Sequence, residues 1–156
     1  MLDEHGGDIR RIQETCVGVM HDIDLRYWDG LADLFAPEVT TDYTSLFGGE
    51  AVTQSAVELI AGWRAALSNL DSTQHLLGPI AVQVNNDAAV AHTHVRAWHK
   101  KAGLAGGESW MVAGHYTFRL IRADEHHWKI SAVKLTVLDQ EGNVEMLAQA
   151  SGTAEA

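Results

Sequence analysis

The sequence predicts an α+β fold in which three N-terminal helices pack into a strongly curved, mostly antiparallel sheet, giving the domain the shape of a cone. Between residues 8 and 70, apolar side chains recur at three- and four-residue spacing, the period of an amphipathic helix. From Ser72 to Leu138 the apolar period changes to two, which is typical of strands with one buried face. Helices followed by a run of antiparallel strands indicate a sheet whose helices gather on one face.

Three segments carry the helical period. A helix over residues 8–25 places five apolar side chains on one face, namely Ile9, Ile12, Cys16, Met20 and Ile23. A second, short helix is predicted over residues 28–35 and ends before Pro37, because the residue before a proline disfavours helical backbone. The third helix opens with the capping-box sequence Ser55-Ala-Val-Glu58. Its apolar stripe is formed by Ile60, Trp63, Leu67 and Leu70.

The remaining regular segments are predicted to be strands. A first strand over residues 38–45 is followed by a turn at Gly48-Gly49. Four longer strands follow, over Ser72–Val84, Ala88–Lys101, Glu108–Arg122 and Trp128–Leu138. The segments Asn85–Asp87 and Ala123–Glu125 supply turn residues between them, and Gly103–Gly107 forms a looser loop.

The chain is expected to form one domain over residues 1–139, followed by a C-terminal tail over residues 140–156. The tail is small and polar apart from one apolar patch of Val144, Met146 and Leu147. We expect it either to be mobile or to dock on a neighbouring subunit.

Composition and charge exclude several classes of function. The chain has 156 residues, of which 46% are apolar and 21% charged, an ordinary globular mixture. Its formal net charge of -10 would repel a phosphate backbone, so nucleic acid is not an expected partner. No apolar run is long enough to span a bilayer, and the N-terminus lacks the apolar segment of a secretory signal. Cys16 is the only cysteine, so a reducing, cytoplasmic location is expected.

Asp24 and His75 are the first candidates for an acid–base pair. Asp24 continues the apolar stripe of the first helix, where a carboxylate is costly unless another group pairs with it. It could equally cap the second helix or face solvent. His75 alternates with Thr73 and Leu77 on one strand face, where a histidine is often only structural. If Asp24 holds one ring nitrogen of His75, the other nitrogen is free to act as a base near neutral pH.

His99 and Tyr43 are further candidates. His99 shares its strand face with small side chains that leave volume for a ligand, among them Ala89, Ala91, Thr93 and Ala97. The phenol of Tyr43 could polarise a carbonyl or simply anchor the first strand. On the opposite face, His92 and His94 have the spacing of half a zinc site. Zinc needs at least a third protein ligand, and no Asp or Glu lies at a spacing that would indicate one, so no metal is expected.

An apolar and partly aromatic stripe follows the strand over residues 108–122, formed by Trp110, Val112, Tyr116, Phe118 and Leu120. Such a stripe is commonly part of a core, but it could also form the wall of a site for a flat ligand. The sequence contains no phosphate loop, dinucleotide fingerprint, nucleophile elbow or Cys–His nucleophile motif. No cofactor is therefore expected.

Taken together, these residues resemble the SnoaL-like group of the NTF2-like superfamily, and within it most closely the scytalone dehydratases. The resemblance covers roughly residues 8–138 and rests on an ordered set of segments. These are Asp24 with Trp28, Asp42-Tyr43, Thr73-Gln-His-Leu-Leu-Gly, Arg96-Ala-Trp-His99, Gly114-His115, and Trp128-Lys-Ile with Lys134. By this resemblance Asp24 is the helix carboxylate and His75 the catalytic histidine. His99 is a second active-site histidine, and Tyr43 reaches the substrate carbonyl through water.

The resemblance implies a cofactor-free lyase of the dehydratase type, acting on a small, largely apolar or aromatic hydroxylated substrate. His75 would take a proton from carbon beside a carbonyl, Asp24 would orient His75, and His99 would protonate the leaving hydroxyl or fix the substrate. Formaldehyde-releasing C–C cleavage and double-bond isomerisation could use the same pair. A non-catalytic module that binds a small molecule is the remaining alternative, because the fold alone does not choose a function.

Three positions depart from the scytalone dehydratases. A pocket tyrosine of that family falls on Ile23, and a serine and an asparagine that hold its substrate fall on Phe118 and Leu120. We therefore expect a substrate other than scytalone, in contact with Ile23 and the apolar stripe. The outer face is too aromatic for bare solvent, with His92, His94, Arg96 and Trp98. A homo-oligomer is expected by resemblance, a trimer in preference to a dimer.

Overall fold

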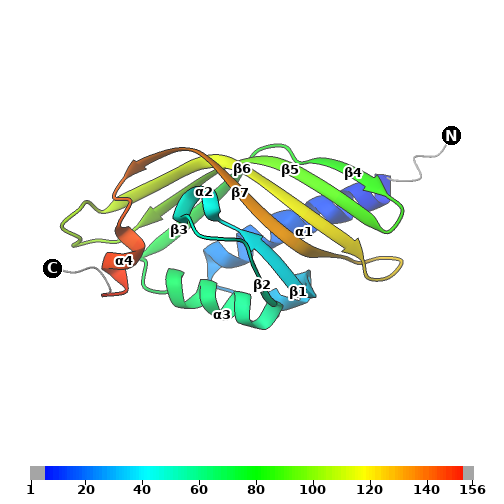
Figure 1. Ribbon diagram of the computed structural model, residues 1–156, viewed down its shortest axis with the longest axis horizontal. Helices are drawn as coiled ribbons and strands as arrows, with labels where there is room; N and C mark the ends of the chain where they lie inside the picture. The colour runs from blue at the N-terminus through cyan, green and yellow to red at the C-terminus, as the bar shows by residue number, and fades with distance from the viewer. Residues whose placement is uncertain (1–5, 153–156) are drawn as a thin grey trace.

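One curved sheet is the centre of the computed structural model, which describes residues 6–152 (Figure 1). It is seven-stranded, with the order β2-β1-β7-β6-β5-β3 and with β4 also paired to β5. The strands are β1 Phe35–Asp42, β2 Val52–Ser55, β3 Ser72–Leu77, β4 Ala81–Asn85, β5 Ala88–Lys100, β6 Ser109–Arg122 and β7 Trp128–Gly142. All neighbouring pairs are antiparallel except β1 and β7, which are parallel. The predicted α+β class and mostly antiparallel sheet are confirmed.

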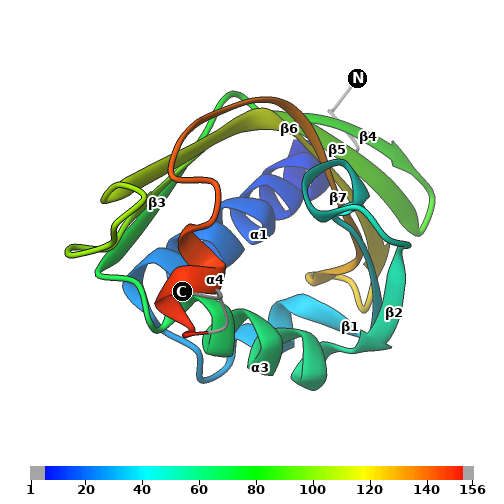
Figure 2. The ribbon, with the colours of Figure 1, turned by 60° about the vertical axis from the view of Figure 1, so that its left-hand side comes forward.

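The helices lie on the concave side of this sheet. They are α1 Gly6–Leu25, the short 3-10 helix η1 Leu31–Leu34, α2 Thr44–Phe47, α3 Ala56–Leu67 and α4 Met146–Ala150. Figure 2 shows the sheet arching over α1, with α3 and α4 on the side where the arch is open. No helix within residues 6–152 is long and apolar enough to cross a bilayer.

α1 is held to the sheet by an apolar face and by a polar anchor at its first turn. Its buried apolar side chains follow the helical period, and they are Ile12, Cys16, Val19, Met20 and Ile23. The carboxylate of Asp8 accepts hydrogen bonds from Arg122 at 3.0 and 2.8 Å and from the indole of Trp128 at 3.0 Å. These bonds lower the pKa of Asp8 to about 2. The start of α1 is thereby fixed at the junction between β6 and β7.

The predicted capping box at the start of α3 is confirmed. The Ser55 hydroxyl accepts the backbone N–H of Glu58 at 3.2 Å, and the Glu58 carboxylate accepts the backbone N–H of Ser55 at 3.1 Å. Further along α3, the ring of Trp63 meets that of Phe35 edge to face, with centroids 5.7 Å apart. This contact fixes α3 over β1.

The predicted helix over residues 28–35 is wrong. Only Leu31–Leu34 form a 3-10 turn, because Gly30 adopts the left-handed conformation at φ 82° and breaks the chain direction. β1 then begins at Phe35, whose side chain is buried in the core. Pro37 is tolerated inside β1 because it lies in the stretch where the pairing register with β7 shifts.

Two strand predictions also need correction. The strand expected over Ser72–Val84 is divided at Gly78-Pro79 into β3 and β4, because Pro79 has no N–H to give to a ladder. Both halves pair with β5. The strand expected over 38–45 ends at Asp42, whose carboxylate accepts the backbone N–H and hydroxyl of Thr44 and turns the chain into α2. The short strand β2 was not predicted.

Residues 140–152 do not behave as the expected tail. β7 continues to Gly142, and α4 follows with Met146 fully buried in the core of its own chain. The side chain of Asn143 makes the connection, since its amide donates to the carbonyl of Gly107 at 2.9 Å and to the side chain of Gln149 at 2.8 Å. The segment therefore packs against its own domain. Residues 153–156 lie outside the described part of the chain.

We expect Asp8→Asn to lower the free energy of unfolding by about 2 kcal/mol near neutral pH, the usual worth of hydrogen bonds to a charged group. The pKa of Asp8 is depressed in the folded state, so its stabilisation is present above the ordinary value of 3.8 and is lost as the pH falls toward about 2. Urea unfolding of both proteins at neutral pH and at about pH 3 should show the difference shrinking in acid.

The matched control is Glu14→Gln, which removes an exposed pair with Arg10 on the same helix. It should change the free energy of unfolding by less than about 0.5 kcal/mol. Equal stability of wild type and Asp8→Asn at neutral pH would contradict the anchoring role of Asp8.

Candidate active site

Asp24 and His75 are in direct contact. Asp24 lies in the last turn of α1, and His75 lies in the middle of β3, opposite Ala97 of β5. The ring Nδ1 of His75 is 2.7 Å from Oδ1 of Asp24, and the backbone N–H of His75 donates to Oδ2 at 2.6 Å. The side chain of His75 is 8% exposed and that of Asp24 is 16% exposed, so the contact is largely shielded from water. One carboxylate thus joins the end of α1 to β3.

Two further residues complete the surroundings of Asp24. The Thr73 hydroxyl donates to Oδ1 of Asp24 at 2.9 Å, and Nη1 of Arg26 donates to that hydroxyl at 2.8 Å. Because a guanidinium can only donate, the single proton of Thr73 is left for the carboxylate. Burial acts to raise the pKa of Asp24, but the hydrogen bonds and charge of His75 and the Thr73 bond outweigh it and hold the pKa below its usual range. Asp24 is therefore ionised at neutral pH.

An ionised Asp24 determines which nitrogen of His75 carries the proton. A carboxylate only accepts hydrogen bonds, so Nδ1 of His75 is the protonated nitrogen. The lone pair of Nε2 is then free. This arrangement can take a proton at Nε2 and stabilise the resulting imidazolium through Asp24.

His99 lies beside His75 but has a different electrostatic environment. It is 6% exposed, its ring is stacked on Trp110 at 4.5 Å, and it meets His75 edge to face at 6.0 Å. Its Nδ1 lies 3.2 Å from the carbonyl oxygen of Trp110, which can only accept, so Nδ1 is protonated and Nε2 is an acceptor. Burial, assisted by His75, lowers the pKa of His99 to about 4. His99 is neutral at neutral pH.

This state of His99 bears on the role that it could play. The sequence left two roles open for His99, protonation of the leaving hydroxyl or fixing of the substrate. The neutral ring has one N–H, which donates a hydrogen bond to a backbone carbonyl, so the ring has no proton available for a leaving group. Its free Nε2 suits the second role, as an acceptor for a hydroxyl of the substrate.

A small apolar cavity adjoins His99. Its volume is about 200 Å³. Five of the candidate residues line it, namely Tyr43, His99, Trp110, Val112 and Tyr116. Asp24 and His75 are not part of the lining, and His75 is connected to the cavity through its contact with His99.

Three expected substrate contacts do not line the cavity. Ile23, Phe118 and Leu120 are 3%, 0% and 1% exposed and belong to the hydrophobic core. Alternation did place Phe118 and Leu120 on the inner face of β6. They lie toward the end of the strand near Arg122, where the sheet packs on α1, whereas the cavity takes its residues from the other end.

Sequence reasoning placed Ala97 on the face that leaves volume for a ligand, but it did not assign the remaining lining residues to a substrate site. They come from five elements and comprise Leu46, Phe47, Trp63, Ala66, Leu67, Ala97, Leu135 and Leu147. Trp63 and Leu67 were recognised as an apolar stripe of the third helix, which was the available signal for this wall. Leu147 was assigned to the tail, so its place in the wall was not foreseen.

Tyr43 and Tyr116 bring two phenol groups to the cavity. Burial raises the pKa of Tyr43 well above its ordinary value, and Tyr116 adds to the rise while Trp63 opposes it. Burial and the charge of Asp24 likewise raise the pKa of Tyr116. Both phenols therefore keep their protons, and each is available as a hydrogen-bond donor.

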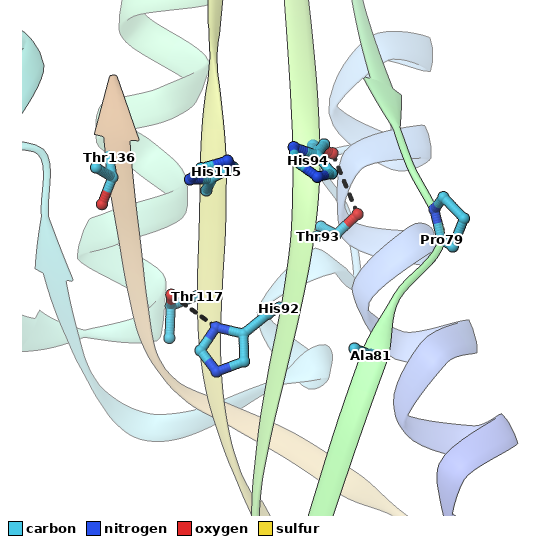
Figure 3. Close-up of a pocket in the computed structure, with 8 residues that line it drawn as sticks. All are labelled: Pro79, Ala81, His92, Thr93, His94, His115, Thr117 and Thr136. Atoms are coloured by element: carbon cyan, nitrogen blue, oxygen red, sulfur yellow. Dashed lines mark hydrogen bonds between the residues drawn. The ribbon is translucent and has the colours of Figure 1, made fainter. Parts of the chain in front are cut away.

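A second hollow, of about 390 Å³, lies on the opposite, outer face of the sheet (Figure 3). His92, His94 and His115 line it, with the rings of His94 and His115 4.7 Å apart and Nδ1 of His92 3.1 Å from the Thr117 hydroxyl. Within residues 6–152, no group of three or more His, Cys, Asp or Glu side chains is arranged to hold a metal ion. The larger hollow lies away from the acid–base pair, so the smaller inner cavity is the candidate active site.

Comparison with known proteins places the chain among SnoaL-like proteins. The sequence profile described as the SnoaL-like domain matches residues 6–134. Among curated proteins, no significant match was found. The crystal structure of the Kfla4162 protein from Kribbella flavida is 30% identical and covers 91% of this chain and 97% of its own, with a TM-score of 0.82.

More distant structures share the fold. A candidate scytalone dehydratase from Novosphingobium aromaticivorans is 17% identical, with 90% of this chain and 91% of that chain covered and a TM-score of 0.74. A hexachlorocyclohexane dehydrochlorinase, LinA-type3 from Novosphingobium barchaimii, is 16% identical, with 86% and 89% covered and a TM-score of 0.69.

The pKa of His99 gives a test of the site's electrostatics. In the folded protein it is about 4, below the ordinary 6.5, so the unfolded chain binds more protons between these values and stability falls as the pH drops through this window. His99→Asn keeps a donor for the Trp110 carbonyl but cannot titrate, so its unfolding free energy should depend less on pH between about 6.5 and about 4. NMR titration of the ring protons checks the midpoint directly, and a value near 6.5 would contradict the assignment.

Proposed function

Because the chain belongs to the SnoaL-like domain family, we propose that it is a cofactor-free lyase of the dehydratase type, acting on a small, largely apolar or aromatic hydroxylated substrate. The observation that carries this proposal is the 2.7 Å contact between Asp24 and His75, close to an apolar cavity. Relatives named as a scytalone dehydratase and a dehydrochlorinase support elimination chemistry.

In the proposed reaction His75 is the base. Its Nε2 takes a proton from the carbon beside a carbonyl of the substrate, and the electron pair of the broken C–H bond forms an enolate. Asp24 holds the ring by Nδ1 and stabilises the imidazolium as it forms. Tyr43 helps to hold the developing enolate oxygen, directly or through water.

The second step expels water. The enolate electrons re-form the carbonyl, the carbon–carbon double bond forms, and the C–O bond to the hydroxyl breaks. Because His99 is neutral and has no proton to give, the imidazolium of His75 returns its proton to the departing oxygen. One histidine then acts as base and acid in turn, and His99 positions the hydroxyl through Nε2.

Isomerisation and C–C cleavage begin with the same histidine. An isomerase would return the proton of His75 to another carbon, and a formaldehyde-releasing lyase would use His75 to deprotonate a hydroxymethyl group. The relatives named as a dehydratase and a dehydrochlorinase favour elimination over both, so dehydration remains the proposal.

We further propose that the outer sheet face is the contact between subunits of a homo-oligomer. Trp98 is 38% exposed there, and Leu76 on the neighbouring β3 is 63% exposed. Light scattering at micromolar concentration should give a multiple of 17.0 kDa for the wild type. Trp98→Glu should shift the mass toward that of one chain. A wild-type mass of a single chain would refute the assembly.

His75→Ala and Asp24→Asn test the catalytic pair. With a panel of β-hydroxy ketones, loss of His75 should lower turnover by about 10²- to 10⁴-fold, the usual worth of a positioned general base. Asp24→Asn should also slow turnover while substrate still binds, because it removes the charge that favours the imidazolium. The double variant should be little slower than His75→Ala, since Asp24 acts through that ring.

His92→Ala, on the outer face, is the matched control and should keep wild-type turnover. Full turnover in both His75→Ala and Asp24→Asn would place the base elsewhere. Loss of thermal stability alone, with no substrate turned over by the wild type, would favour the binding-module alternative.

A further inference from the structure

Tyr116 carries a buried polar group whose role the Asp24–His75 pair does not explain. It lies in β6 between Thr93 of β5 and Leu135 of β7, and it is 5% exposed. Its ring packs on Phe118, with centroids 5.3 Å apart, and its side chain lines the inner cavity. Within residues 6–152 the hydroxyl has no hydrogen bond to another residue, and the one fully enclosed side-chain atom without a partner is Nη2 of Arg26, so the Tyr116 hydroxyl borders the open space of the cavity.

A hydroxyl that borders a cavity and has no protein partner bonds to water or to a ligand in that cavity. The cavity is the space available to that partner. Burial and the nearby charge of Asp24 keep the phenol protonated, so Tyr116 presents a donor.

The rest of the cavity limits what the partner can be. Apart from the two phenols and His99, its lining is apolar, and Trp63, Trp110 and Phe47 provide aromatic surface. Its volume of about 200 Å³ is below the roughly 300–1,000 Å³ of ordinary ligand sites. A ligand of this size has one ring and few substituents.

We propose that Tyr116 donates a hydrogen bond to the carbonyl oxygen of the substrate, and that the substrate is therefore a one-ring ketone or aldehyde rather than a polycyclic compound. The inference rests on the proposed function only in assigning that oxygen to the carbon acid from which His75 takes its proton. Negative charge grows on this oxygen as the proton leaves, so the donor binds the transition state more strongly than the substrate. Tyr116 is thus both a specificity-determining and a catalytic residue.

Two probes of nearly the same shape distinguish the contribution of the carbonyl oxygen to binding from that of the ring. Acetophenone has a carbonyl oxygen where α-methylstyrene has a methylene group. Binding to the full chain can be followed by the fluorescence of the wall tryptophans, with each dissociation constant corrected for the probe's partition between water and hydrocarbon. Wild type should favour acetophenone by about 10-fold, the worth of one good hydrogen bond in a dry site.

Tyr116→Phe removes only the hydroxyl and should abolish this preference while α-methylstyrene still binds. Tyr27→Phe is the matched control, because Tyr27 is 62% exposed and lies outside the cavity, and it should keep the wild-type preference. As a second measurement on the wild type, the ¹³Cζ resonance of Tyr116 should move with acetophenone and not with α-methylstyrene. This measurement does not depend on the folding of any variant.

The proposal is overturned if acetophenone keeps its advantage in Tyr116→Phe, if the Tyr116 resonance does not respond, or if neither probe binds. It fails independently of the proposed function. Turnover that depends on His75 but not on Tyr116 would contradict this inference and leave the proposed function in place. If acetophenone binding depends on Tyr116 but none of the β-hydroxy ketones is turned over, the lyase proposal is contradicted and this inference stays in place.

Discussion

The structure depends on one carboxylate at the end of α1. Most contacts between α1 and the sheet are apolar, and apolar contacts have no preferred direction, so they leave the helix free to slide and rotate. Asp8 fixes the start of α1, and Asp24 fixes its end, because it accepts hydrogen bonds from the Thr73 hydroxyl and from both the backbone and the ring of His75. A shift of α1 by one residue would leave a half-buried charge unpaired, which costs several kcal/mol. The position of the His75 ring follows from this constraint.

Two neighbouring histidines show how environment divides chemical roles between identical side chains. Both carry the proton on Nδ1 and leave Nε2 free. The Nδ1–H of His75 donates a hydrogen bond to a carboxylate, whereas that of His99 donates to a backbone carbonyl. Only His75 has a counter-ion for its imidazolium. His99 is buried without one, which accounts for its low pKa and confines it to accepting hydrogen bonds. Little water reaches the two histidines, and the resulting low local dielectric strengthens both the Asp24–His75 interaction and the penalty for charging His99.

The sequence predicted the parts of the molecule that rest on periodicity. The period of α1 and the alternation along β5 and β6 were sufficient for the fold class and for the inward face. The residues alone left Asp24 open between a pair with His75, a helix cap and solvent, and the resemblance to a known family favoured the pair. Local backbone events were not predictable in the same way. Gly30 delayed the start of the second helix and left only a 3-10 turn, and Pro79 divided one strand into two. Alternation also could not say how far along β6 the cavity extends, so Phe118 was placed in the wall although it belongs to the core.

The placement of α4 bears on the order in which the site comes into being during synthesis. The acid–base pair needs only α1, β3 and the strand β5 beside it, all of which precede residue 101. The cavity also needs Leu147, which follows β7. Since chains emerge from the ribosome N-terminus first, the residues of the Asp24–His75 pair are synthesised before the last residue of the cavity wall. Completion of the cavity wall therefore comes late in biosynthesis, and a polypeptide that ends before α4 would contain Asp24 and His75 but lack Leu147 in the wall.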